Sequence, residues 1–209
     1  MEKVRVKKGI FALLMTVMVW MVIQFDGIGA IPGMNQIVGM ILALCVWMVG
    51  AVGIYYMLRK QNKECFYYDN SFFESRDYMV LFFTVMGGMA ISAGNYFYGG
   101  LKPLLVREFF NGDLLYTIRN VLYYPLEILL MLELLICSQR AGELLTKKKA
   151  IPWGALALFV LWGLPHIVYH GYEDGLVSAL RAFVYCIPFY ASHKKIRTGY
   201  IGMLILWMM

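Results

Sequence analysis

The chain has 209 residues, of which 61% are hydrophobic and 15% are charged, and its mean hydropathy is +0.64. In an ordinary soluble domain about a quarter of the residues are charged. Here the apolar residues form long uninterrupted blocks, which is typical of a membrane protein. The net charge of +6 does not indicate nucleic-acid binding, because the basic residues occur in short clusters between the apolar blocks. We therefore expect the lipid bilayer as a partner and no nucleic acid.

Seven apolar blocks follow one another along the chain, and a spanning helix needs roughly 20 residues. The first six blocks are long enough to cross a bilayer, whereas the seventh has only 11 residues. No linker separates domains. The sequence therefore predicts an all-α, polytopic membrane helical bundle with six full transmembrane helices plus a short seventh, in a single integral membrane domain over residues 1–209. The blocks are 9–25, 36–58, 78–98, 117–137, 151–169, 175–191 and 199–209.

Basic residues alternate between the two sides of this predicted bundle. Fifteen of the 19 lysines and arginines fall before the first block or in the second, fourth and sixth loops. Loops rich in lysine and arginine stay on the cytoplasmic side. We therefore predict an integral protein of the plasma (cytoplasmic) membrane with a cytoplasmic N-terminus and with residues 147–149 on that same side. No small-residue cleavage site follows the first block, so we expect it to remain as an uncleaved helix.

Ionisable residues interrupt three of the apolar blocks: Glu127 and Glu133 in the fourth, His166 in the fifth and Arg181 in the sixth. Such a side chain costs a few kcal/mol in a bilayer, so it usually faces a partner, water or a functional site. At 1.5 Å per residue, Glu127 lies roughly 15 Å and Arg181 about 9 Å below the outer surface. His166 lies closer to the outer end of its helix. Pro165, directly before His166, is expected to kink that helix and free a backbone carbonyl.

The two carboxylates of the fourth block are not expected to act as a pair. Glu133 is rotated about 120° from Glu127 around a helix of 3.6 residues per turn, so the two do not share a face. We therefore expect Glu133 to lie outside any site built on Glu127. Near the end of the same helix, Arg140 and Glu143 are expected to form a surface ion pair.

Three interpretations of the polar groups remain open. In the first, Glu127 is a general base that activates water, and His166 orients it or stabilises an oxyanion. In the second, His166, His170 one turn later and Glu127 bind a metal ion such as zinc; otherwise no cofactor is expected. In the third, which is structural, Glu127 pairs with Arg181 while His166 bonds a backbone carbonyl. Asn95 in the third block is a further polar candidate.

Two short motifs lie in the fourth and fifth blocks. PLEILLM contains Glu127 as one acid of the pattern Glu-Glu-x-x-x-Arg, without its first Glu and its Arg. LFVLWGLPHI follows the pattern Phe-x-x-x-His, with Trp162 in place of Phe and His166 as the histidine. Over residues 115–209 this arrangement resembles the CPBP family, the polytopic membrane proteases that include CAAX-processing enzymes and bacteriocin-associated proteins. A third family motif, His-x-x-x-Asn, has no counterpart here.

The resemblance implies an intramembrane peptidase, a hydrolase of membrane-proximal peptides or membrane-protein substrates. Glu127 would be its water-activating carboxylate and His166 its second-motif histidine, with Arg181 or Asn95 substituting for the unmatched groups. The alternative is a non-catalytic membrane-embedded binding, regulatory or immunity-like protein on the same scaffold. A small-solute transporter is the third possibility, although no paired discontinuous helices are visible.

Overall fold

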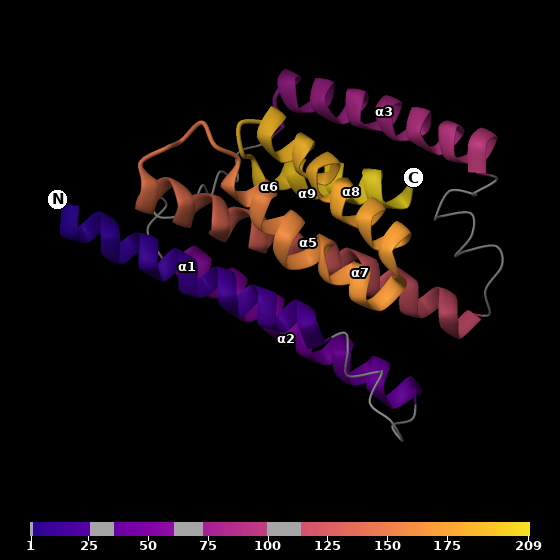
Figure 1. Ribbon diagram of the computed structural model, residues 1–209, viewed down its shortest axis with the longest axis horizontal. Coiled ribbons are helices and arrows are strands. Elements are labelled where there is room, and N and C mark those ends of the chain that lie inside the picture. The colour runs from indigo at the N-terminus through magenta and orange to yellow at the C-terminus, as the bar shows by residue number, and fades with distance from the viewer. Residues whose placement is uncertain (1, 26–35, 61–72, 100–113) are drawn as a thin grey trace. The chain divides into compact units, whose positions relative to one another are not determined.

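The computed structural model describes residues 2–25, 36–60, 73–99 and 114–209. All regular elements within these ranges are helical, as predicted (Figure 1). The elements are α1 (Glu2–Gln24), α2 (Gln36–Lys60), α3 (Ser75–Gly99), α5 (Leu114–Thr146), α6 (Trp153–Leu158), the π-helix η2 (Phe159–Gly163), α7 (Pro165–His170), α8 (Tyr172–Ala191) and α9 (Ile196–Met208).

Four of these helices, α1, α2, α3 and α5, are long and apolar enough to cross a membrane. Three shorter apolar stretches cover Trp153–Val168, Gly175–Ala191 and Ile196–Met208. Large apolar side chains face outward along several helices; Val49 is 73% exposed and Val168 is 84% exposed. Soluble monomers rarely carry extensive apolar surfaces, so these faces indicate contact with lipid. An all-helical membrane protein is therefore the architecture that the described residues support.

The chain divides into two compact units. Unit 1 comprises Met1–Tyr68 and Leu129–Phe183, and unit 2 comprises Asp69–Ile128 and Val184–Met209. The helices α5 and α8 each begin in one unit and end in the other. The single domain expected over residues 1–209 stays a prediction.

In unit 1, glycines allow α1 to lie close to its neighbours. A Cβ on Gly50 of α2 would lie 2.6 Å from the Val22 side chain of α1. A Cβ on Gly9 of α1 would lie 2.8 Å from the Leu145 side chain near the end of α5. Small residues at such points let membrane helices approach one another, so van der Waals contact replaces the hydrophobic driving force that lipid removes.

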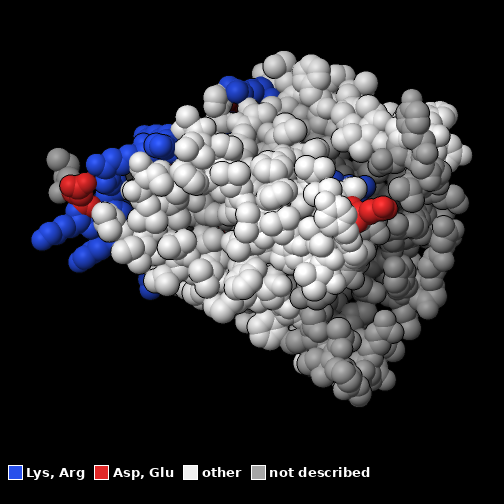
Figure 2. All heavy atoms as spheres, viewed as in Figure 1, with Lys and Arg blue, Asp and Glu red and all other residues white. Residues whose placement is uncertain are grey.

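Basic residues of unit 1 gather at one of its ends. Lys147, just after α5, places its Nζ 3.3 Å from Glu2 Oε1 at the start of α1. Figure 2 shows lysine and arginine side chains collected over this region, beside a broad surface without charges. The chain start and residues 147–149 therefore lie at the same end of unit 1, as the basic pattern predicts.

The helix loses its regular α-helical hydrogen bonding just before Pro165, where Phe159–Gly163 form a π-helix. The Leu164 N–H donates to the Phe159 carbonyl, five residues earlier, at 2.9 Å. Pro165 has no N–H, so the Leu161 carbonyl four residues before it lacks its α-helical donor. Trp20 of α1 donates its indole Nε1–H to that carbonyl at 3.0 Å. A side chain from another helix thus replaces the missing backbone bond.

The helix α8 packs backbone-to-backbone against η2 and α7. A Cβ on Gly163 would lie 2.5 Å from the Ala179 Cα, and one on Gly175 would collide with the Ile167 backbone. Gly171, with φ of +87°, makes the turn between α7 and α8, a conformation that glycine adopts without strain. These glycines hold the segment around Pro165 against α8.

In unit 2, α3 packs along α9. The Ser92 hydroxyl of α3 donates to the Met209 carbonyl at 2.5 Å. On the other side of α9, the Tyr200 hydroxyl donates to the Pro125 carbonyl of α5 at 3.2 Å. The final helix therefore contacts both other long elements of its unit.

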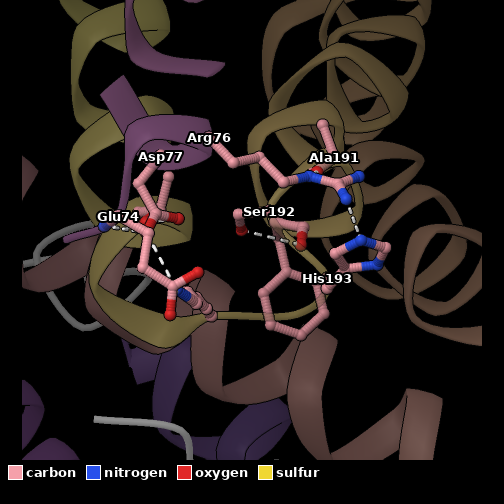
Figure 3. Close-up of polar contacts among 9 residues, drawn as sticks. Glu74, Arg76, Asp77, Ala191, Ser192 and His193 are labelled. Carbon is pink, nitrogen blue, oxygen red and sulfur yellow. Dashed lines mark hydrogen bonds and ion pairs between the residues drawn. The ribbon is translucent and has the colours of Figure 1, made fainter. Parts of the chain in front are cut away.

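A buried carboxylate fixes the start of α3 to the turn between α8 and α9. Asp77 is 1% exposed and accepts a hydrogen bond from the Glu74 N–H at 2.8 Å (Figure 3). It also accepts from Lys195 Nζ and from the Thr198 hydroxyl, each at 2.9 Å. Lys195 lies 3.1 Å from Glu74 Oε1 as well. The hydrogen bond to Asp77 raises the pKa of Lys195, so its ammonium group stays charged at physiological pH.

Asp77→Ala is expected to lower the free energy of unfolding by about 2–3 kcal/mol, because charge-assisted hydrogen bonds are lost from a buried position. Thr198→Val removes one neutral donor and should cost about 1 kcal/mol. Denaturant unfolding of the detergent-solubilised chain, followed by circular dichroism, measures both changes. Unaltered stability of Asp77→Ala would show that this cluster does not hold α3 in place.

Trp20→Phe is expected to cost about 1–2 kcal/mol, because the Leu161 carbonyl loses its donor. In a Pro165→Ala background the restored N–H at position 165 can donate to Leu161, so the same substitution should cost measurably less. A double-mutant cycle of unfolding free energies isolates this coupling. An equal cost of Trp20→Phe in both backgrounds would contradict the replacement of the backbone bond by Trp20.

Candidate functional site

His166 is held in one orientation by its own helix. Its Nδ1 lies 2.7 Å from the Trp162 carbonyl, one turn earlier. A carbonyl oxygen can only accept, so Nδ1 carries the proton of the neutral ring, and a second proton would be taken up at Nε2. The buried Trp162 ring lies against the imidazole, with 4.5 Å between ring centroids. The bond from His166 to a backbone carbonyl, expected under the structural interpretation, is confirmed. Helical π-segments such as η2 are frequent at functional sites.

Glu127 and His166 belong to different units. Glu127 is 6% exposed on the part of α5 that lies in unit 2, whereas His166 lies in unit 1. Arg181 is exposed on α8, in unit 1. Both the predicted catalytic pair of Glu127 with His166 and the predicted ion pair of Glu127 with Arg181 join residues of different units. Both therefore stay predictions.

Glu133 is a buried carboxyl in an apolar part of α5. It is 3% exposed on the part of α5 that lies in unit 1. Within the described part of the chain, neither of its carboxyl oxygens has a hydrogen-bond partner. Its neighbours along the helix, Leu132 and Leu134, and Cys137 one turn later are buried and offer little polarity. Burying a polar group without hydrogen bonds costs free energy, so such a group needs an explanation. For an ionisable residue in a membrane helix, the first hypothesis is a functional site.

The third acid of α5, Glu143, accepts a hydrogen bond and forms an ion pair. Gln139 donates to Glu143 Oε1 at 2.7 Å, and Arg140 Nη1 lies 3.6 Å from Glu143 Oε2. The predicted Arg140–Glu143 ion pair is therefore present, but the expectation of a surface position was wrong, because Glu143 is only 4% exposed. Gln139 also accepts from the Gly154 N–H at 2.9 Å and donates to the Ile151 carbonyl at 3.1 Å. These bonds tie the end of α5 to the start of α6, so Glu143 has a structural role.

Asn95 and His170, two further candidates, lie on helices that the structure describes, but the structure does not describe their side chains. Asn95 belongs to α3, and His170 is the last residue of α7. No three His, Cys, Asp or Glu side chains converge to hold a metal ion in the ranges that the structure describes. Because the His170 side chain is outside those ranges, a metal site of His166, His170 and Glu127 stays a prediction.

Unit 1 therefore contains a carboxyl and an imidazole, the two groups that general acid–base hydrolysis most often uses. From the sequence we expected Glu133 to lie outside any site built on Glu127, because the two acids do not share a helical face. A signal was nevertheless present, since Glu133 stands in the run ILLMLELLIC, where every neighbour within one turn is apolar. Such a setting offers a carboxyl no local partner.

Comparison of the chain with protein-family models, with curated proteins and with solved structures finds no match in any of the three. The likeness to the CPBP family accordingly stays a resemblance of two motifs within residues 115–209.

Proposed function

We propose that the protein is a polytopic protein of the plasma membrane, with six full transmembrane helices, a short seventh helix and a cytoplasmic N-terminus. Four helices of sufficient length and the three shorter apolar stretches support this arrangement. The fifth span would run continuously through α6, η2 and α7, because the π-helix joins α6 to α7 without a break in the helical path. The basic end of unit 1, where Lys147 meets Glu2, would be cytoplasmic.

We further propose that this protein is an intramembrane peptidase of the CPBP kind, acting on membrane-proximal peptides. The observation that carries the proposal is the presence in one compact unit of two groups: Glu133, a buried carboxyl that has no hydrogen-bond partner among the described residues, and His166, an imidazole with a fixed tautomer. Glu133 thereby joins Glu127, the acid that the family resemblance suggests, as a candidate base. Arg181, Asn95 and His170 are supporting candidates for charge stabilisation.

The proposed reaction is hydrolysis by general acid–base catalysis. The carboxylate takes a proton from a water molecule while the water oxygen forms a bond to the peptide carbonyl carbon. The negative charge that develops on the carbonyl oxygen would be stabilised by a hydrogen-bond donor from the supporting candidates Arg181, Asn95 and His170. The carboxyl passes the proton that it took from water, directly or through a water molecule, to Nε2 of His166, and the imidazolium gives it to the departing amine as the C–N bond breaks, so both groups return to their starting states. No cofactor takes part in this scheme.

A non-catalytic membrane protein that binds a lipid or a protein partner is the second candidate function. It is favoured by a different observation, an apolar cavity between α3, α8 and α9 whose lining includes none of the acid–base candidates. Under this alternative, the polar groups of α5 and α7 would serve packing alone.

The proposed topology predicts opposite accessibility for the two ends of unit 1. In a background without the native cysteines, Lys148→Cys should react with a membrane-impermeant maleimide only after cells are permeabilised. Glu173→Cys, just after the turn between α7 and α8, should react in intact cells and serves as the matched control. Labelling of Lys148→Cys from outside intact cells would reverse the assigned orientation.

The proposed reaction predicts loss of cleavage without loss of fold. Glu133→Gln keeps the shape of the side chain but cannot take a proton from water, so cleavage of a single-span reporter with a membrane-proximal peptide should fall at least about 10²-fold. His166→Ala should cost a similar factor. Glu173→Gln, an exposed acid, is the control and should retain full activity. Unfolding curves in detergent establish that each variant remains folded.

Glu127→Gln decides which acid is the base. If it alone abolishes cleavage while Glu133→Gln is silent, the base is Glu127, the acid indicated by the sequence motif. If both glutamine variants and His166→Ala cleave the reporter as the unaltered protein does, or if that protein does not cleave it, the peptidase proposal is wrong and the binding function is favoured.

A further inference from the structure

Unit 2 contains a cavity of about 690 Å³ between α3, α8 and α9. This volume falls within the roughly 300–1,000 Å³ of small-molecule sites. The lining is mostly apolar and includes Met79, Phe83, Ile91, Ile187 and Leu206. Phe83 is 66% exposed and Ile187 is 57% exposed. The cavity is therefore a groove that opens to the medium around these helices, which in a membrane is lipid.

A fixed cation stands at one end of the groove. Arg76, in the first turn of α3, is exposed and belongs to the lining. It donates through Nε to the Ala191 carbonyl at 3.0 Å and through Nη1 to His193 Nε2 (Figure 3). A guanidinium group has more N–H donors than these two contacts use. The first partner is the last residue of α8 and the second lies in the turn that follows it, so the two contacts hold the charge at the mouth of the groove.

The dimensions of the groove match a lipid chain. From Arg76 to Ile91 the lining follows α3 for about 22 Å, at 1.5 Å per residue. The hydrocarbon of one leaflet is about 15 Å thick, half of the roughly 30 Å core. An acyl chain that begins at the level of Arg76 can therefore lie along the apolar lining over the full depth of its leaflet.

We propose that this groove binds an anionic phospholipid, with the phosphate at Arg76 and one acyl chain along Met79, Phe83 and Ile91. The planar guanidinium binds a phosphate through two parallel hydrogen bonds. Basic pockets between transmembrane helices recognise anionic headgroups in the same way. The positive end and the apolar length complement the two parts of such a lipid. This inference does not depend on the peptidase proposal.

Two glycines of α3 provide a matched pair of variants. A Cβ on Gly87, which lines the groove, would meet no atom within 4 Å, so a larger side chain there can fill the groove without displacing a neighbour. A Cβ on Gly94 of the same helix also meets nothing within 4 Å, and Gly94 is not part of the lining. Gly87→Leu should therefore exclude the lipid, while Gly94→Leu changes the same helix elsewhere.

Native mass spectrometry of the purified full chain, titrated with phosphatidylglycerol or with phosphatidylcholine of identical acyl chains, tests the proposal. The unaltered protein should retain phosphatidylglycerol preferentially. Arg76→Gln should weaken this retention about fivefold to tenfold, and Arg76→Lys should restore part of it because the charge returns. Gly87→Leu should abolish retention, whereas Gly94→Leu should match the unaltered protein.

Equal retention of the two lipids by the unaltered protein would overturn the proposal, since the groove would then hold bulk lipid. So would equal behaviour of Gly87→Leu and Gly94→Leu, because the lipid would then bind elsewhere. Unfolding curves accompany each titration, and Gly87→Leu leaves the contacts of Arg76 in place. A folded Gly87→Leu variant thus decides the question even if Arg76→Gln is unstable.

Discussion

The need to satisfy hydrogen bonds inside apolar helices is the constraint on which this structure depends. In lipid no water replaces a missing partner, so donors and acceptors must be matched within the protein. Pro165 lacks the N–H that would donate to the Leu161 carbonyl in an α-helix. The preceding residues form a π-helix, and Trp20 of α1 donates to that carbonyl instead. The following residue is His166, bonded to the preceding turn. The helix defect, its repair by α1 and the placement of the imidazole are therefore parts of one feature.

The two buried carboxyls of Asp77 and Glu133 differ in their hydrogen bonding. Asp77 receives hydrogen bonds from three donors, and the elements that supply them are held together at the start of α3. Glu133 receives none within the described residues. A satisfied buried acid rigidifies its surroundings, whereas an unsatisfied one leaves a cost that a proton, a water molecule or a substrate group can relieve. For this reason we assign Asp77 to architecture and only propose a chemical role for Glu133, although both are almost completely buried.

Several features follow from local sequence alone. The length and composition of an apolar block decide whether a helix can cross a membrane, so the helical membrane architecture was predictable. The clustering of basic residues predicted that the chain start and residues 147–149 lie on the same side. In the structure both lie at one end of unit 1. The irregular helix at Pro165 and the bond between His166 and a backbone carbonyl lie within one or two turns of a single helix, so both could be anticipated.

Only the tertiary structure decided which polar groups find partners. Glu133 and Glu143 stand on the same helix, yet Glu143 gains a network because α6 returns beside the end of α5. The donor to the Leu161 carbonyl is 141 residues away in sequence, and Lys195 lies 118 residues from Asp77. The groove likewise needs three helices from separate parts of the chain. Composition and local spacing determine how each helix forms and where it can lie, but partners from distant segments depend on packing, which no single stretch of sequence specifies.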